Sequence, residues 1–314
     1  MARKKKMLFC DYYDDWIKTY KEGSVREVTL NKYLMTAKRL REIIPDLDIR
    51  DLDRRTYQHI LNEYALTHEK QTTSDFHHQV KACVKDLFHD GLLDRDPTYR
   101  AIVKGREPGP KKPKYLQTEE LKALMKTLDL SYGRSTDWFV CIIAKTGIRY
   151  AEALGLTPGD FDFDNATLTI NKSWNYKSIE GGFQRTKTIA SERKISIDWQ
   201  IIGQFKPLIW DLPVDEPIFV KKFDDGSYER IFNSTINNFM KRKCEQAGVP
   251  KISLHSLRHT HASVLLAAGV SIHAISERLG HSNVGVTQET YVHVLNELKT
   301  ADESKVMSTL MLLT

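Results

Sequence analysis

The sequence predicts a mostly α-helical protein with a small antiparallel β-sheet, organised as two domains. Three observations lead to this fold class. Apolar residues recur at helical spacing through most of the 314 residues, strand-like alternation is confined to residues 161–170 and 187–197, and a segment rich in proline and glycine at residues 104–114 divides the chain. A chain of this length can bury a core in each of two domains.

Residues 1–103 predict a helical bundle preceded by a basic arm at residues 3–6. Apolar residues at spacings of three and four mark four helices, the last of which ends at Asp90-Gly91. The helices are marked by Tyr13, Trp16, Ile17 and Tyr20; Tyr33, Leu34, Ala37 and Leu40; Tyr57, Ile60, Leu61 and Tyr64; Phe76, Val80, Val84, Leu87 and Phe88, and most of the aromatic residues among these are expected in the core. The arm is either a solvated end or a segment that lies along a phosphate backbone.

Residues 104–114 predict an extended linker between the domains. Three prolines and two glycines exclude a helix interior or a central strand. The segment also carries five cationic residues: Lys104, Arg106, Lys111, Lys112 and Lys114. These charges either serve solubility alone or lie beside the phosphates of a nucleic acid.

Residues 115–299 predict a second, mixed domain. Thr118 is the expected cap of its first helix, with Glu119 and Glu120 as an acidic first turn, and a buried helix passes through Phe139 and Ile143. The two alternating stretches supply the sheet, to which Phe219 adds a short edge. The later segments are helical again.

Residues 300–314 predict a C-terminal tail helix. Thr300 and Glu303 have the spacing of a capping box. The apolar residues after them share one helix face: Val306, Met307, Leu310, Met311 and Leu313. The tail either folds back onto its own domain or docks on a neighbouring subunit.

The composition indicates a soluble globular protein, with 41% hydrophobic and 28% charged residues. A net charge of +6 permits nucleic-acid binding without requiring it. The four cysteines lack the spacing of a zinc site, which predicts reduced, packed thiols and no metal. Neither a signal peptide nor a membrane span is recognisable, so we expect a cytoplasmic protein.

Residues 279–293 end in a helix whose tyrosine is not explained by packing. Gly280 is expected to stop the preceding helix, His281 follows it directly, and Thr287 is the expected cap of a short helix that carries Tyr291. A phenol with a pKa of about 10 is a poor nucleophile unless cations and hydrogen-bond partners stabilise its charge.

Three other segments supply such groups. His255 and Arg258 are three residues apart at the start of a helix and therefore share one face. Arg149 lies on a short helix after a glycine break. Lys187 lies on the first of two strand-like runs around a turn at residues 190–192.

In their order and spacing, these motifs resemble the tyrosine recombinase family, the integrases of phages and mobile elements. The match involves TGIRYAE, the lysine run, HSLR, LGH and the tyrosine, over about the last two thirds of the chain. The catalytic set that the resemblance implies is Arg149, Lys187, His255, Arg258, His281 and Tyr291, with Glu152 supporting the first arginine.

The resemblance also implies a mechanism. Tyr291 becomes joined to the 3′-phosphate of a cleaved strand and leaves a free 5′-hydroxyl, so rejoining needs neither ATP nor a cofactor. Two arginines with fork-shaped donors can hold the added negative charge without a metal ion. Lys187 suits protonation of the leaving 5′-oxygen, whereas His255 and His281 suit proton handling and phosphate binding.

The implied function is site-specific recombination, with integration or excision of a phage or mobile element as its role. The implied partners are double-stranded DNA attachment sites, held as two duplexes by a homotetramer, together with a directionality factor or a host DNA-bending protein. The N-terminal bundle would be the core-binding domain that clamps DNA. The protein would work at the bacterial nucleoid, without a membrane.

Two other classes remain as alternatives. Residues 271–295 superficially resemble a helix-turn-helix, which is typical of a non-enzymatic DNA-binding regulator, but this leaves the arginine and lysine motifs unexplained. A metal-dependent nuclease needs clustered carboxylates. Asp160, Asp162 and Asp164 are close together, yet they alternate along one loop or strand edge and lack a matching cluster.

Overall fold

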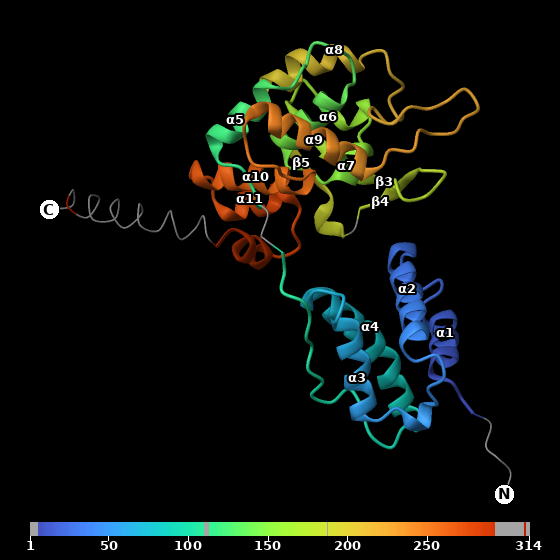
Figure 1. Cartoon of the computed structure of the whole chain (residues 1–314). Helices are drawn as coiled ribbons and strands as arrows, with labels where there is room; N and C mark the ends of the chain where they lie inside the picture. Colours follow the sequence, from blue (N-terminus) through green and yellow to red (C-terminus); the bar gives the residue numbers. More distant parts are fainter. Residues whose placement is uncertain (1–5, 110–112, 187, 293–310, 312–314) are drawn as a thin grey trace, which may run out of the picture. The chain divides into compact units, whose positions relative to one another are not determined.

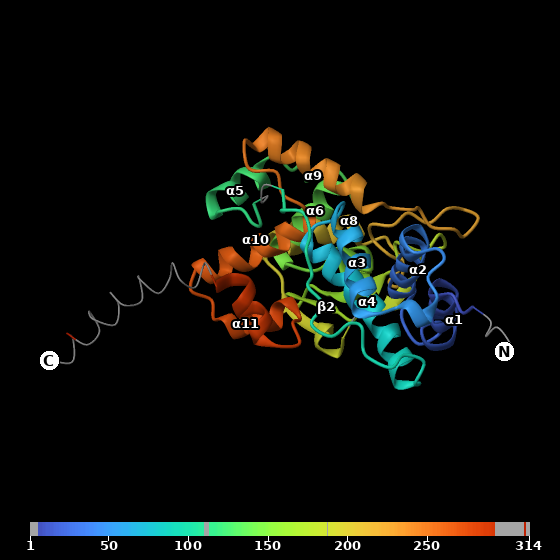
Figure 2. The same ribbon diagram turned by 60° about the horizontal axis from the view of Figure 1, so that its bottom comes forward.

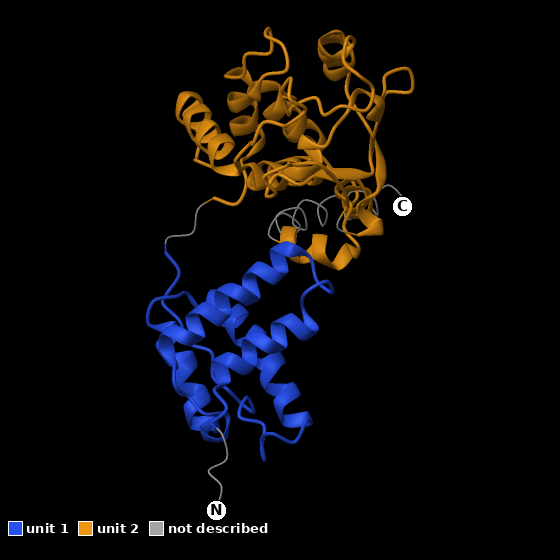
Figure 3. Ribbon diagram, turned by 90° about the vertical axis from the view of Figure 1, so that its right-hand side faces the viewer, with its two compact units in different colours: residues 1–111 blue, residues 112–314 orange. Residues whose placement is uncertain are grey.

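The computed structural model describes residues 6–109, 113–186, 188–292 and 311. The chain falls into two compact units, residues 1–111 (unit 1) and 112–314 (unit 2), which Figure 3 colours separately. Within the described ranges, we find no helix with the length and apolar character that a membrane crossing requires.

Unit 1 is a helical bundle around an aromatic core (Figure 1). Its helices are α1 (Phe9–Tyr20), α2 (Glu27–Ile43), α3 (Arg54–Ala65) and α4 (Lys70–His89), with a 3₁₀ turn at Ile49–Asp51. They occur where the periodicity predicted them. Trp16 is buried, and its indole N–H donates to Asp86 at 2.6 Å, which joins α1 to α4. Among the aromatic residues that mark the helices, Tyr20 is an exception to the expected burial, since it is 52% exposed at the end of α1.

The first residues of the predicted linker belong to unit 1. The backbone N–H of Arg106 donates to the carbonyl of His68 at 2.8 Å. Gly105 lies so close to the start of α4 that an added Cβ would stand 2.1 Å from the backbone nitrogen of Lys70. Gly105 and Arg106 of the predicted linker therefore pack against unit 1, where a glycine fits because it has no Cβ to clash.

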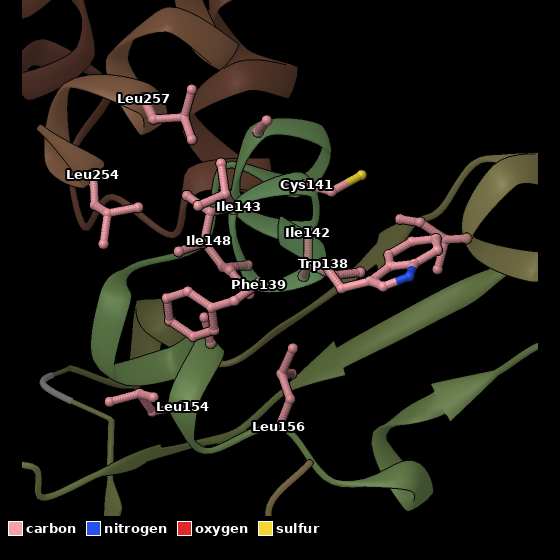
Figure 4. Close-up of a cluster of buried hydrophobic side chains, with 14 of the residues drawn as sticks. Trp138, Phe139, Cys141, Ile142, Ile143, Ile148, Leu154, Leu156, Leu254 and Leu257 are labelled. Atoms are coloured by element: carbon pink, nitrogen blue, oxygen red, sulfur yellow. The ribbon is translucent and has the colours of Figure 1, made fainter. Parts of the chain in front are cut away.

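Unit 2 surrounds the buried helix α6. Its helices are α5 (Thr118–Lys126), α6 (Thr136–Thr146), α7 (Tyr150–Leu154), α8 (Lys206–Ile209), α9 (Asn233–Ala247), α10 (Leu254–Ala267) and α11 (Ile272–Leu279), followed by a helical stretch at residues 284–292. Figure 4 shows Phe139 and Ile143 of α6 in the core with Leu254 and Leu257 of α10. Helices α10 and α11 lie side by side in both Figure 1 and Figure 2, and a second apolar cluster that includes Leu266 and Leu279 joins them.

The strands form two small antiparallel sheets, where one was expected. The first contains β1 (Phe161–Asp162), β2 (Thr167–Ile170) and β5 (Arg193–Ser196) in the order β1-β2-β5, and the second pairs β3 (Lys172–Trp174) with β4 (Phe183–Arg185). The two runs on either side of residues 190–192 therefore do not pair with each other. Alternation along a strand predicts its buried face and not its partner.

Two other local predictions differ from the structure. The cap of α5 is Gln117, one residue before the expected Thr118, and it forms a capping box with Glu120. Phe219 lies in a bend and not at a strand edge, and its ring packs edge-on against Phe139, with centroids 5.1 Å apart. The predicted tail, residues 300–314, lies outside the described residues except for Met311.

The four cysteines are free and buried, as predicted. Burial raises the pKa of the Cys10 thiol to about 11 and that of the Cys141 thiol to about 12. The pKa values of Cys83 and Cys244 are raised for the same reason. These side chains therefore act as packed, unreactive groups.

Candidate active site

Arg149 lies where α6 ends and α7 begins. Gly147 stops α6 with φ of 68°, and an added Cβ there would stand 2.6 Å from the ring of His261. Arg149 is the N-cap of α7 and not a residue inside that helix, and its backbone N–H donates to Glu152 at 2.9 Å. The guanidinium donates to Glu152 at 2.7 Å and to the carbonyl of Gly280 at 3.1 Å. The capping geometry thus directs Arg149 towards the end of α11.

Glu152 is a buried carboxylate between two guanidiniums. It accepts from Arg149 and, at 2.9 Å, from Arg193 of β5. Burial acts to raise the pKa of Glu152, but Arg193 and Arg149 outweigh it, so the pKa lies below its usual value. Arg193 also donates to the carbonyls of Ser191 and Arg278. No sequence motif indicated Arg193, because its role depends on contacts between distant segments.

Arg258 is only 4% exposed, and main-chain carbonyls hold its guanidinium. It donates to the carbonyls of Gly147 and Leu279, both at 2.7 Å, and its Nη2 lies 3.1 Å from Nε2 of His281. Burial, followed by the charge of Arg149, lowers the pKa of Arg258 to about 9. The side chain therefore still carries its charge at neutral pH.

His281 is a neutral imidazole whose tautomer follows from its neighbours. Arg258 can only donate, so Nε2 of His281 accepts and the ring proton lies on Nδ1, which donates to Thr287 Oγ1 at 2.7 Å. Burial, Arg258 and Arg149 lower the pKa of His281 to about 4. The expected role of Thr287 as a helix cap is wrong, because the helix already begins at residue 284, after Asn283 accepts from the N–H of Gly285.

Tyr291 lies on the last described helix, as predicted, with its side chain buried against α10. Only 2% of the residue is exposed, and its hydroxyl lies 3.0 Å from Nδ1 of His259. Burial raises the pKa of Tyr291 to about 12, although Arg258 acts to lower it. Sequence reasoning missed His259. The sequence feature that could have identified His259 is its position, because it directly follows Arg258 and lies four residues after His255 on the same helix face.

His255 is the exposed member of this helix face. Its ring meets the ring of His259 edge-on, with centroids 4.7 Å apart and an interplanar angle of 86°. Helix α10 begins just before it, where the Ser253 side chain accepts from the backbone N–H of Ser256. His255 is therefore placed at the open side of the site.

The remaining predicted residues are exposed or lie outside the described residues. Lys187, Lys111 and Lys112 lie outside the described residues. Lys104 and Arg106 are exposed residues of unit 1. Lys114 is exposed in unit 2, and its charge contributes to lowering the pKa of His259.

The structure thus gathers Arg149, His255, Arg258, His281 and Tyr291 around the end of α11. In the described part of this cluster, the guanidiniums of Arg149, Arg193 and Arg258 face one carboxylate, Glu152. The excess positive charge and the fork-shaped donors suit a phosphate group. Among the residues described, no group of three His, Cys, Asp or Glu side chains is arranged to hold a metal ion.

Comparison with known proteins gives the cluster a family context. The profile of the phage integrase family matches residues 114–297. The integrase of Staphylococcus phage L54a is 31% identical over 172 residues, 52% of this chain and 49% of the phage protein. The transposase of transposon Tn916 from Enterococcus faecalis is 26% identical over 239 residues, 71% of this chain and 58% of the transposase. The chain spans about half the length of these curated relatives.

Solved structures show the same fold. The Tn1549 transposon integrase in complex with a circular intermediate DNA aligns with a TM-score of 0.75 at 18% identity, covering 96% of this chain and 99% of that chain. A λ integrase dimer bound to a COC′ core site aligns with a TM-score of 0.65 at 14% identity, covering 91% of this chain and 77% of that chain. At these identities, the likeness establishes the fold alone.

Proposed function

Because this chain belongs to the phage integrase family, we propose that it is a site-specific DNA recombinase that cleaves and rejoins DNA through a 3′-phosphotyrosyl intermediate. One observation carries the proposal. Arg149 donates to the carbonyl of Gly280, Arg258 donates to that of Leu279, and Tyr291 is hydrogen-bonded to the residue that follows Arg258. A nucleophile and two phosphate-binding groups thus come together from segments far apart in the sequence.

Arg149 and Arg258 bind the nonbridging oxygens of the scissile phosphate and stabilise the charge that develops when Tyr291 attacks. Preorganisation supports this role, since Glu152 and main-chain carbonyls hold both guanidiniums in place. His281 is neutral and donates from Nδ1 to Thr287, so its contribution is to orient Arg258 through Nε2.

Lys187 and His255 complete the proposed catalytic set. Lys187 protonates the leaving 5′-oxygen, a role that the family resemblance suggests. His255 is exposed on the face of α10 that carries Arg258, which suits a hydrogen bond to a phosphate oxygen.

At the level of the whole protein, we extend the proposal to integration or excision of a phage or mobile element. Unit 1 and the cationic residues Lys104, Arg106, Lys111, Lys112 and Lys114 bind the DNA backbone. The active assembly is a homotetramer that holds two duplex attachment sites at the nucleoid, with a directionality factor or a DNA-bending protein as a further partner. Gel-shift and crosslinking assays with attachment-site DNA test these partners.

The test of the proposed chemistry is covalent attachment to DNA. Wild-type protein is incubated with candidate attachment-site DNA, and the products are separated on denaturing gels. We expect a protein–DNA adduct with the wild type and none with Tyr291→Phe, although this variant still binds the site. Tyr132→Phe is the matched control, because Tyr132 is 74% exposed and lies outside the site. An adduct with Tyr291→Phe would refute the assignment, and a DNA-binding regulator would give no adduct even with the wild type.

A further inference from the structure

A basic nitrogen stands next to the hydroxyl of Tyr291. Nδ1 of His259 lies 3.0 Å from the tyrosine oxygen, and the two rings are tilted by 60° with centroids 5.8 Å apart. His259 projects from α10, the helix that also carries Arg258, and it is only partly exposed. Both members of the pair therefore project from helices, His259 from α10 and Tyr291 from the stretch at residues 284–292.

The protonation states define the direction of this hydrogen bond. The pKa of Tyr291 is raised to about 12, so the phenol keeps its proton at neutral pH. The pKa of His259 is lowered to about 4 by burial, His255, Arg258 and Lys114, so the imidazole is neutral and has one acceptor nitrogen. We assign Nδ1 as that acceptor, because the phenol proton then has a partner in a buried site.

We propose that His259 is the general base of the reaction, taking the proton of Tyr291 at Nδ1 as the tyrosine attacks the phosphodiester. This assignment rests on the proposed recombinase function and adds a catalytic residue to it. It also separates two tasks on α10, since Arg258 binds the phosphate while its neighbour in the sequence activates the nucleophile.

The step balances without a further reactant. The tyrosine oxygen forms a bond to phosphorus as its proton moves to His259, the bond from phosphorus to the 5′-oxygen breaks, and the general acid protonates that oxygen. In rejoining, the 5′-hydroxyl attacks phosphorus and gives its proton back to the deprotonated general acid, the bond from phosphorus to the tyrosine oxygen breaks, and the imidazolium of His259 returns its proton to that oxygen. One residue thus serves as base in cleavage and as acid in rejoining.

Bound DNA makes His259 a better base. Among the described residues, the charged and titratable groups that face it are His255 and Arg258 on α10, together with His281, Lys114 and Tyr291. A scissile phosphate adds negative charge against these cations and so raises the pKa of His259 towards neutrality. The base would therefore gain its strength only when substrate is present.

The test compares His259→Gln with wild type in single-turnover cleavage between about pH 6 and 9. Glutamine keeps a hydrogen-bonding group near the phenol but cannot take up a proton. The matched control is His273→Gln, a change of the same kind at an exposed position of α11. Half-site binding and thermal melting verify folding, and His259→Asn serves as a second variant.

We expect His259→Gln to lose a factor of about 10² to 10⁴ in adduct formation near pH 7. The rate should then rise about tenfold per pH unit more steeply than that of the wild type, as phenolate forms without a base. A substrate with sulfur in place of the 5′-bridging oxygen should not rescue the variant, because the missing proton transfer is at the nucleophile.

Three results would overturn the assignment: an unchanged rate, a loss of the same size at every pH, or rescue by the 5′-bridging sulfur. An unchanged rate would mean that His259 has no role in cleavage. A loss of the same size at every pH would mean that it serves packing alone. Rescue by sulfur would mean that it protonates the leaving 5′-oxygen. The wild-type reaction separates these results from failure of the proposed function. If the wild type forms no adduct with attachment-site DNA, both proposals fall.

Discussion

Replacing Glu152 by glutamine removes the negative charge that lies between two guanidiniums. The carboxylate accepts from the backbone N–H of Arg149, from its guanidinium and from Arg193, and both it and the Arg193 side chain are almost fully buried. A neutral amide has one acceptor oxygen for these donors and presents an N–H₂ group to a cation. The variant therefore keeps the size of the side chain and loses its charge balance.

The expected destabilisation is about 3–5 kcal/mol, the usual cost of breaking a buried ion pair. For a domain the size of unit 2, this corresponds to a lowering of the melting temperature by roughly 6–20 °C. The exposed pair of Glu119 with Lys122 provides a matched control, because the Glu119 side chain is 81% exposed. Glu119→Gln should cost less than about 1 kcal/mol.

The pH dependence gives a second measurement of the same interaction. The folded-state pKa of Glu152 is depressed, so the stability it contributes is fully present above its unfolded pKa of about 4.3. This contribution is lost as the pH falls through the lower folded-state value. Urea unfolding should therefore show a wild-type advantage over Glu152→Gln that is constant near neutrality and shrinks in acid. A difference below about 1 kcal/mol at pH 7 would refute the charge-balance reasoning.

Two further predictions concern proton transfer and orientation. Lys187→Ala should slow cleavage of normal DNA yet recover on a 5′-bridging-sulfur substrate, which needs little protonation; loss without selective rescue would move the general acid elsewhere. Thr287→Val removes the acceptor of the His281 Nδ1–H bond and should cost about 1–3 kcal/mol in unfolding experiments, with slower adduct formation and unchanged half-site binding. Ser282→Ala, a hydroxyl deletion at an exposed neighbouring position, is the control. Equal behaviour of these two variants would contradict the role of Thr287.

Local patterns predicted the helices well, because the period of an amphipathic helix is set within a few turns of the sequence. Gly280 stops α11 with φ of 67°, as its position after an apolar-periodic segment predicted. The pairing of strands was harder to predict from the sequence. The partner of β4 is β3 and not β5, and nothing in the alternation of either run distinguishes these choices.

The sequence singled out the motif residues as candidates, whereas it did not lead us to Arg193 and His259, which contact them. Arg193 and His259 act through contacts with Glu152 and Tyr291, which are far from them in the sequence. Thr287 was predicted as a helix cap from the residues next to it, but in the structure its hydroxyl accepts a hydrogen bond from His281. Roles that depend on a partner across the fold thus require the structure.

The hydrogen bonds of Arg258 have a consequence for conformational entropy. Among its contacts with described residues, three N–H groups are directed at Gly147, Leu279 and His281, so the guanidinium cannot turn. A guanidinium has five N–H groups, which leaves two in fixed directions for a phosphate oxygen. Ordering a free arginine on binding costs about 0.5–1.5 kcal/mol. Here folding has already immobilised the side chain, so a phosphate bound as proposed would meet a donor pair that needs no further ordering.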